Sequence, residues 1–100
     1  MLVTETTQVF VEALNNKLAT ETFRLEATAG RNYDKIINVS VSGNHESRSV
    51  HAFIDRKTSG LLKAAGWAAP AKGIRYNLST PEGLERAIRQ ADKFGGYLYR

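Results

Sequence analysis

Residues 33–55 read YDKIINVSVSGNHESRSVHAFID, and this stretch predicts the β-hairpin around which the fold is built. In its first half, β-branched apolar residues alternate with polar ones, which is typical of a strand. Residues 42–45, SGNH, have the composition of a tight turn. We therefore predict two antiparallel strands over residues 33–41 and 48–55.

Alternation along these two strands predicts one face packed against helices and one open face. The side chains expected to face the helices are Ile37, Val39, Val41, Val50, Ala52 and Ile54. Ile36 and Phe53 are out of phase with this set, so we expect them on the open face. Apolar residues on an open sheet face are typical of a docking or dimerisation surface. A homodimer through that face is therefore one expectation.

The residues before the hairpin predict a helix and a further strand. Thr6 or Thr7 can cap a helix that ends near Ala19. Its apolar residues recur at spacings of three and four, and they are Phe10, Val11, Leu14 and Leu18. Over residues 23–27 the period changes to two, which indicates a half-buried strand.

The residues after the hairpin predict a short fourth strand over 61–65 and an extended segment over 74–78. Pro81 follows a threonine that can act as a cap, so a second helix begins there. Its apolar stripe consists of Leu84, Ala87, Ile88, Ala91 and Phe94. We expect Gly95-Gly96 to end this helix, and residues 97–100 to pack on the core or to add an edge strand.

Together these elements predict one α+β domain over residues 1–100, with the order α-β-β-β-(β)-α. The sheet is expected to be antiparallel, with three or four strands and both helices packed on one face. The chain has no cysteine, so neither a disulfide nor a thiolate metal site is expected. No stretch approaches the ~18 apolar residues of a membrane span, and the first residues lack the pattern of a secretory signal. We expect no membrane association.

Positive charge is concentrated in the middle of the chain. The net charge is +4; residues 31–76 hold eight basic and three acidic residues, whereas residues 1–30 hold two basic and four acidic ones. A cationic surface on a sheet can attract phosphates collectively. The same charge is equally compatible with a role in solubility alone.

Aromatic residues lie among these cations. We predict nucleic-acid binding through a basic sheet and loop surface made of Arg48, Arg56, Lys57, Lys63, Trp67, Lys72, Arg75 and Tyr76. On this hypothesis the cations contact phosphates, and Trp67 or Tyr76 stacks on bases. The alternative hypothesis makes Trp67 an anchor in the pocket of a protein partner. Partial burial of Trp67 against the core is a third interpretation.

No catalytic, metal or cofactor site is predicted. His45 falls in a turn and His51 on the outward face of a strand, with no cysteine to act as a nucleophile. Two histidines at this spacing match no zinc motif, and the glycines form no phosphate-binding loop. We therefore expect a non-catalytic binding protein.

Four blocks of the sequence resemble small uncharacterised proteins encoded by tailed bacteriophages. The blocks are YDKII at 33–37, SVHAFID at 49–55, APAKGIRYNL at 69–78 and GGYLY at 95–99. The resemblance covers roughly residues 30–100. It implies a phage accessory protein in the cytoplasm of an infected bacterium, and it brings no site residues with it. In that setting the alternative partner is a host protein that the chain captures or inhibits.

Overall fold

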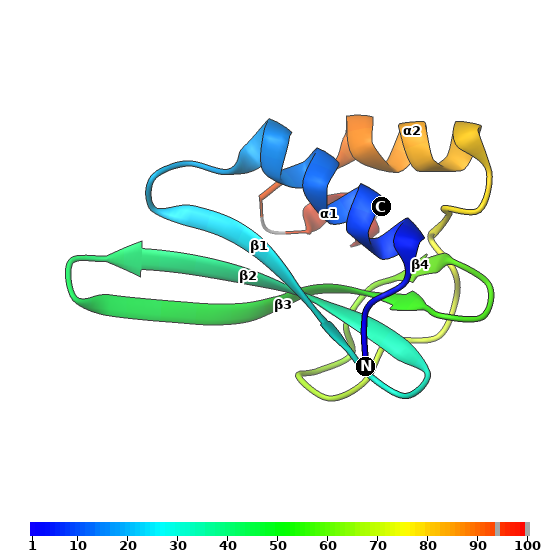
Figure 1. Ribbon diagram of the computed structural model, residues 1–100, viewed down its shortest axis with the longest axis horizontal. Coiled ribbons are helices and arrows are strands. Elements are labelled where there is room, and N and C mark those ends of the chain that lie inside the picture. Colours follow the sequence, from blue (N-terminus) through cyan, green and yellow to red (C-terminus); the bar gives the residue numbers. More distant parts are fainter. Residues whose placement is uncertain (94, 100) are drawn as a thin grey trace.

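The computed structural model of the protein describes residues 1–93 and 95–99. Its elements are α1 (Glu5–Leu18), β1 (Phe23–Ala29), β2 (Tyr33–Ser42), β3 (His45–Asp55), β4 (Gly60–Leu62), β5 (Tyr76–Asn77), α2 (Pro81–Gln90) and the 3₁₀ helix η1 (Gly96–Tyr99). Among the described residues, the strands form one antiparallel sheet in the order β1-β2-β3-β4-β5. Both α-helices lie on one face of it (Figure 1). The predicted α+β fold is confirmed, with five strands rather than three or four.

Helix α1 begins earlier than predicted because its N-cap is Thr4. The Thr4 side-chain oxygen accepts the backbone N–H of Thr7 at 3.2 Å. Asp34 of β2 completes this helix start, since its Oδ2 accepts the Thr4 N–H at 2.9 Å and the Thr7 hydroxyl at 2.7 Å. A carboxylate at a helix N-terminus also interacts favourably with the helix dipole. Thr7 is consequently buried inside the first turn.

Helix α2 begins at Pro81, as predicted, and the Thr80 side chain accepts the N–H of Gly83 at 3.0 Å. It ends at Gln90, well before the glycine pair that was expected to end it. Phe94, which was assigned to its apolar stripe, lies outside the described residues. Neither α-helix in the described part of the chain has the length and apolar character that a membrane crossing requires.

The early end of α2 is stabilised by Lys17, which comes from the last turn of α1. Its Nζ donates hydrogen bonds of 2.8–2.9 Å to three carbonyl oxygens at the end of α2, those of Ile88, Arg89 and Ala91. The last carbonyls of a helix have no partner within the helix, and a cation there also favours the negative end of the dipole. One lysine thus ties the two helices together.

Replacing Lys17 with methionine is expected to lower the free energy of unfolding by about 1 kcal/mol, because the carbonyls at the end of α2 lose their cation. The melting temperature should fall by roughly 4 °C or more for a domain of this size. Calorimetry on Lys17→Met measures the change. Lys72→Met is the matched control, since Lys72 is exposed and forms no ion pair within residues 1–93 and 95–99; equal effects of the two changes would contradict the role of Lys17.

The core between the sheet and the helices draws on nearly every element. Its buried members are Phe10, Leu14, Phe23, Leu25, Ile36, Ala52, Ile54, Leu61, Leu78, Ala87, Ala91, Tyr97 and Leu98. The described residues 96–99 thus pack back on the core, which was one of the two fates predicted for residues 97–100. They do so as η1, with Tyr97 and Leu98 buried.

The prediction of faces was wrong for β2. Asp34 and Ile36 face the helices and are fully buried, so Ile36 is a core residue and not an exposed one. Ile37 and Val39 lie on the other face, because successive side chains of a strand point to opposite sides. Both faces of β2 carry apolar residues, so alternation alone does not reveal which face the helices cover.

A β-bulge in β3 is a second reason why the predicted and observed sheet faces differ. Ile36 pairs with Ala52, but the next residue, Ile37, pairs with Val50, so His51 is the additional residue. The bulge leaves Ala52 on the helix side and turns Val50 to the other side. The strict alternation assumed from the sequence had placed both of them toward the helices.

Candidate nucleic-acid interface

The candidate site lies on the face of the sheet that turns away from α1 and α2, which we call the lower face. Its residues from β2 and β3 include Lys35, Ile37, Val39, Arg48, Val50 and Phe53. The loop of residues 63–75, between β4 and β5, passes beneath this face (Figure 1). Phe53 was predicted to be exposed on an open face, and this is wrong: it is buried, with Lys35 and Leu62 beside it in register.

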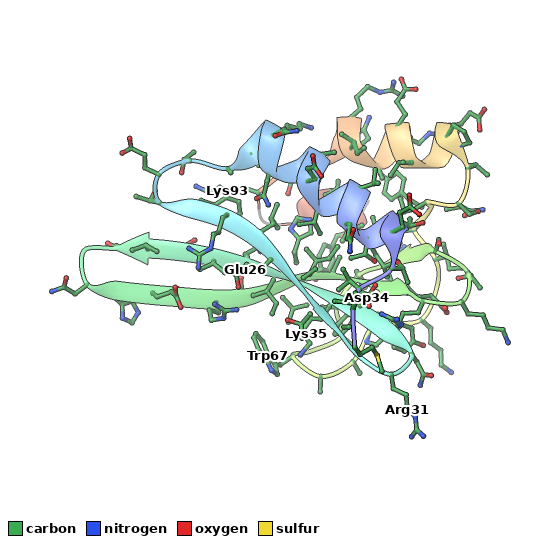
Figure 2. The ribbon with its side chains drawn as sticks, viewed as in Figure 1. Glu26, Arg31, Asp34, Lys35, Trp67 and Lys93 are labelled. Carbon is green, nitrogen blue, oxygen red and sulfur yellow. The ribbon has the colours of Figure 1, made fainter. Side chains whose placement is uncertain are left out.

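Trp67, in this loop, presents an aromatic ring to solvent beside a lysine of the sheet. Its side chain is 54% exposed, and the Lys35 Nζ lies 4.4 Å from its ring centroid (Figure 2). The same ammonium lies 5.9 Å from the ring of Phe53. A cation over an aromatic face is attracted by the ring quadrupole, so Lys35 helps to hold Trp67 against the sheet.

A groove of about 490 Å³ opens next to Lys35. It is lined by the turn between β1 and β2 (residues 28–33), by Phe53 and by residues 68–70 of the loop. Tyr33 meets Phe53 edge to face, with ring centroids 6.2 Å apart. Arg31 extends from the turn into solvent (Figure 2).

A second groove, of about 440 Å³, borders Trp67. It is lined by residues 48–50 of β3, by residues 64–67 of the loop and by Tyr99. Tyr99 is 63% exposed, and the Lys63 Nζ lies 4.7 Å from its ring centroid. Trp67 and Tyr99 therefore each combine an exposed ring with a lysine ammonium.

Arg48, a predicted phosphate contact, belongs to a ring of four charges, which we call the charge ring. Its ion pairs are Arg48–Glu26 at 2.9 Å, Arg48–Glu46 at 3.5 Å, Arg24–Glu26 at 2.7 Å and Arg24–Glu46 at 3.6 Å. Val39, which pairs with Arg24 on one side and Arg48 on the other, is fully buried beneath them. The hydrogen bonds of Arg48 and then of Arg24 lower the pKa of Glu26, and Glu26 raises the pKa of Arg48. The charge ring has no net charge.

Arg56, another predicted phosphate contact, is also neutralised. Its Nη1 donates to Oδ1 of the fully buried Asp34 and to the carbonyl oxygen of Leu2, the latter at 3.0 Å. A guanidinium held by a buried carboxylate is not free to bind phosphate. We therefore leave Arg48 and Arg56 out of the interface proposed below.

The other predicted site residues lie in several places. Tyr76 packs on the helix side, with its ring centroid 5.9 Å from that of Tyr97, so it does not share a surface with Trp67. Lys57, Lys72 and Arg75 are exposed and form no ion pair within the described residues. Of the eight predicted residues, Trp67 lies beside the lower face, and Lys63 lies over the ring of Tyr99, which lines the second groove together with Trp67. Sequence reasoning missed Arg31 and Lys35 at the first groove and Tyr99 at the second.

A buried polar cluster lies on the other side of the sheet. His51 bonds through Nδ1 to Asn38 Oδ1 at 3.0 Å and through Nε2 to the Tyr97 hydroxyl at 2.8 Å. Burial lowers the pKa of His51 to about 4, although Asp92 and a backbone hydrogen bond of Lys93 act in the opposite direction. Burial also raises the pKa of Tyr97. Within residues 1–93 and 95–99, no three His, Asp or Glu side chains gather in a way that could hold a metal ion.

The chain belongs to a family of unknown function (DUF7717), whose model matches residues 2–100. No curated protein matches the chain, and neither does any solved structure. Because the family has no assigned activity, the function is inferred from the geometry of the lower face.

Proposed function

We propose that the protein is a non-catalytic accessory protein of a tailed bacteriophage that binds nucleic acid through its lower face in the cytoplasm of the infected bacterium. One observation carries the proposal: Trp67 and Tyr99 are exposed rings that each have a lysine ammonium within 5 Å of the ring centroid, beside two grooves. Proteins that bind single-stranded nucleic acid without sequence preference combine aromatic rings, on which bases stack, with cations that bind the phosphates. The phage setting rests on the four sequence blocks described above.

The charge that remains on the lower face after internal pairing supports the proposal. The charge ring is neutral, whereas Arg31, Lys35 and Lys63 form no ion pair within the described residues. Arg31 and Lys35 line the first groove, and Lys35 also contacts Trp67, whereas Lys63 contacts Tyr99 at the second groove. Their attraction for phosphates would hold the backbone while a base stacks on the free side of the Trp67 ring.

A single strand suits this face better than a duplex. The bases of a duplex are stacked on one another, so they offer no free face to Trp67 or Tyr99. An unpaired strand can place successive bases on separate rings. We therefore expect single-stranded DNA or RNA to bind more tightly than a duplex of the same sequence.

Titration of a labelled single-stranded oligonucleotide tests the proposal. The chain has one tryptophan, so quenching of Trp67 fluorescence reports stacking directly. Trp67→Ala is expected to weaken binding about tenfold, since stacking of one base on an aromatic ring is worth ~1–3 kcal/mol. The double variant Lys35→Ala/Lys63→Ala should reduce the slope of log K against log salt concentration by about 1.4, because two phosphate contacts with a single strand are lost.

Arg86→Ala is the matched control, because it removes one exposed cation from α2 on the opposite side of the sheet. It should leave both affinity and salt slope almost unchanged. Absence of binding at ~50 mM salt and micromolar protein would refute the proposal. So would equal losses of affinity in Arg86→Ala and Lys35→Ala.

A host protein is the second candidate partner, and the apolar residues beside Trp67 favour it. Ala68, Ala69 and Pro70 line the first groove next to the exposed ring, and a tryptophan in such surroundings is a frequent hot spot of protein interfaces. Here Trp67→Ala should abolish recovery of one defined partner from host lysate, whereas Lys35→Ala should have little effect at any salt concentration. Equal recovery by wild type and Trp67→Ala would remove this candidate.

A further inference from the structure

The outer edge of β3 is open near the hairpin turn. β4 pairs with β3 only at Phe53 and Ile54, so the half of β3 that starts at His45 has β2 on one side and no strand on the other within the described residues. This edge belongs to the hairpin that projects beyond the helices (Figure 1). An open edge offers main-chain donors and acceptors to a further strand.

The ladder shows which residues offer those groups. In β1, Leu25 turns its N–H and C=O outward, where both bond to the side chain of Asn15. Its partner Asn38 therefore bonds toward β3, and so Ser49, opposite Asn38, bonds inward. Since main-chain groups alternate in direction along a strand, Arg48 and then Glu46 present theirs at the open edge. No main-chain hydrogen bond occupies these groups within the described residues.

In this half of the sheet, a side chain caps the outer edge of β1, whereas none of the described side chains caps the outer edge of β3. The Asn15 amide of α1 donates to the Leu25 carbonyl at 3.0 Å and accepts the Leu25 N–H at 2.8 Å, so a side chain takes the place of a neighbouring strand. At the edge of Glu46 and Arg48, no described side chain does the same. Closing one edge is a common protection against pairing with other chains, and the β3 edge lacks it.

We propose that two copies of the chain pair through this edge, β3 against β3 and antiparallel, about a twofold axis at Ser47. In this register Glu46 of each copy lies opposite Arg48 of the other, so opposite charges meet twice. A register centred on Arg48 would instead place two arginines opposite each other. The Ser47 register also joins the outward main-chain groups of Glu46 to those of Arg48 in the second copy.

The same register suits the surrounding surface. The Glu46–Arg48 contacts across the axis continue the alternation of the charge ring from one copy into the other. Asn44, in the hairpin turn of the second copy, falls opposite Val50 of the first copy. Val50 lines the second groove, so the turn of one copy lies next to the second groove of the other. Residues paired in an antiparallel ladder share a face, so the two lower faces form one surface. The result is a continuous sheet across two copies.

A single cysteine tests the axis, because the chain has none of its own. In Ser47→Cys the two introduced thiols face each other in a pair without mutual hydrogen bonds, with Cβ atoms about 4.5–5.5 Å apart, which allows a disulfide. Mild oxidation should give a covalent dimer at least tenfold faster than in Ser49→Cys, where the residue opposite is His45 of the second copy. Equal or faster cross-linking of Ser49→Cys overturns the proposal.

Sedimentation equilibrium of the unmodified chain is the second measurement. We expect self-association between micromolar and millimolar concentration, and a loss of about tenfold or more in Arg48→Glu, which places two acidic residues opposite each other. The double variant Glu46→Arg/Arg48→Glu restores opposite charges across the axis and should regain association. Circular dichroism confirms that both variants fold. A wild-type chain that stays monomeric at millimolar concentration overturns the proposal.

Discussion

Asp34→Ala is expected to lower the free energy of unfolding by about 3–5 kcal/mol, the cost of breaking a buried ion pair by removing one partner. The Asp34 carboxylate is fully buried and accepts from the Thr4 N–H, the Thr7 hydroxyl and the Arg56 guanidinium. Its removal leaves Arg56 without a counter-charge and the start of α1 without an acceptor. Domains of this size are stable by only ~5–15 kcal/mol, so the variant should be close to unfolding at physiological temperature.

Urea denaturation of Asp34→Ala measures the loss, and Glu85→Ala is its control. Glu85 pairs with Arg89 at 3.3 Å, but both side chains are exposed, and such pairs contribute ~0–1 kcal/mol. Asp34→Asn keeps the shape and one acceptor but not the charge, so it should fall between the two. A change below about 1 kcal/mol in Asp34→Ala would show that this network is not what holds α1 to the sheet.

The parts of the fold that local signals specify were predictable. The turn at residues 42–45 and the proline at the start of α2 act within a few residues, and the structure places both as expected. The bulge at His51 has no comparable signal. Without it, the hairpin turn would pair Lys35 with Ala52, whereas the structure pairs Lys35 with Phe53 on the lower face. Lys35 shares a face of β2 with Ile37 and Val39, and the sequence analysis had assigned that face to the helices, so the lysine that contacts Trp67 was missed.

In the candidate site, the sequence likewise did not show which cations are neutralised by ion pairs. Arg48 and Arg56 were predicted as phosphate contacts because cations cluster in that part of the sequence. Their acidic partners, Glu26 and Asp34, are each 22 residues away along the chain. Only strand pairing brings these residues together, so the sequence around Arg56 does not reveal its neutralisation. For Arg48 a local signal exists, because Glu46 lies two residues before it on the same face of β3 and pairs with it at 3.5 Å. Trp67 and Lys63 could be identified because an aromatic residue among cations in one loop is a signal that the sequence shows directly.

Acidification from pH 6.5 to pH 4 is expected to lower the stability of the fold by about 3 kcal/mol through His51 alone. Burial lowers its pKa from 6.5 to about 4, so between these values the unfolded chain binds a proton that the folded chain does not. The contribution of neutral His51 to the free energy of unfolding is therefore present above pH 6.5, and it is lost as the pH falls from 6.5 through 4. Glu26, whose pKa is lowered from 4.5 by Arg48 and Arg24, adds its own loss only below that value.

Burial holds His51 neutral, and its hydrogen bonds fix which ring nitrogen carries the proton. Asn38 Oδ1 can only accept, so Nδ1 carries the proton and Nε2 accepts from the Tyr97 hydroxyl. Protonation of Nε2 would turn a donor toward that hydroxyl inside the core. Urea denaturation across pH 4–7 measures the slope, and His51→Gln, which does not titrate, should flatten it between pH 6.5 and 5. An unchanged slope in His51→Gln would place the titrating group elsewhere. A flattened slope, even at lower absolute stability, identifies the bulge residue of β3 as the group through which acid destabilises the core.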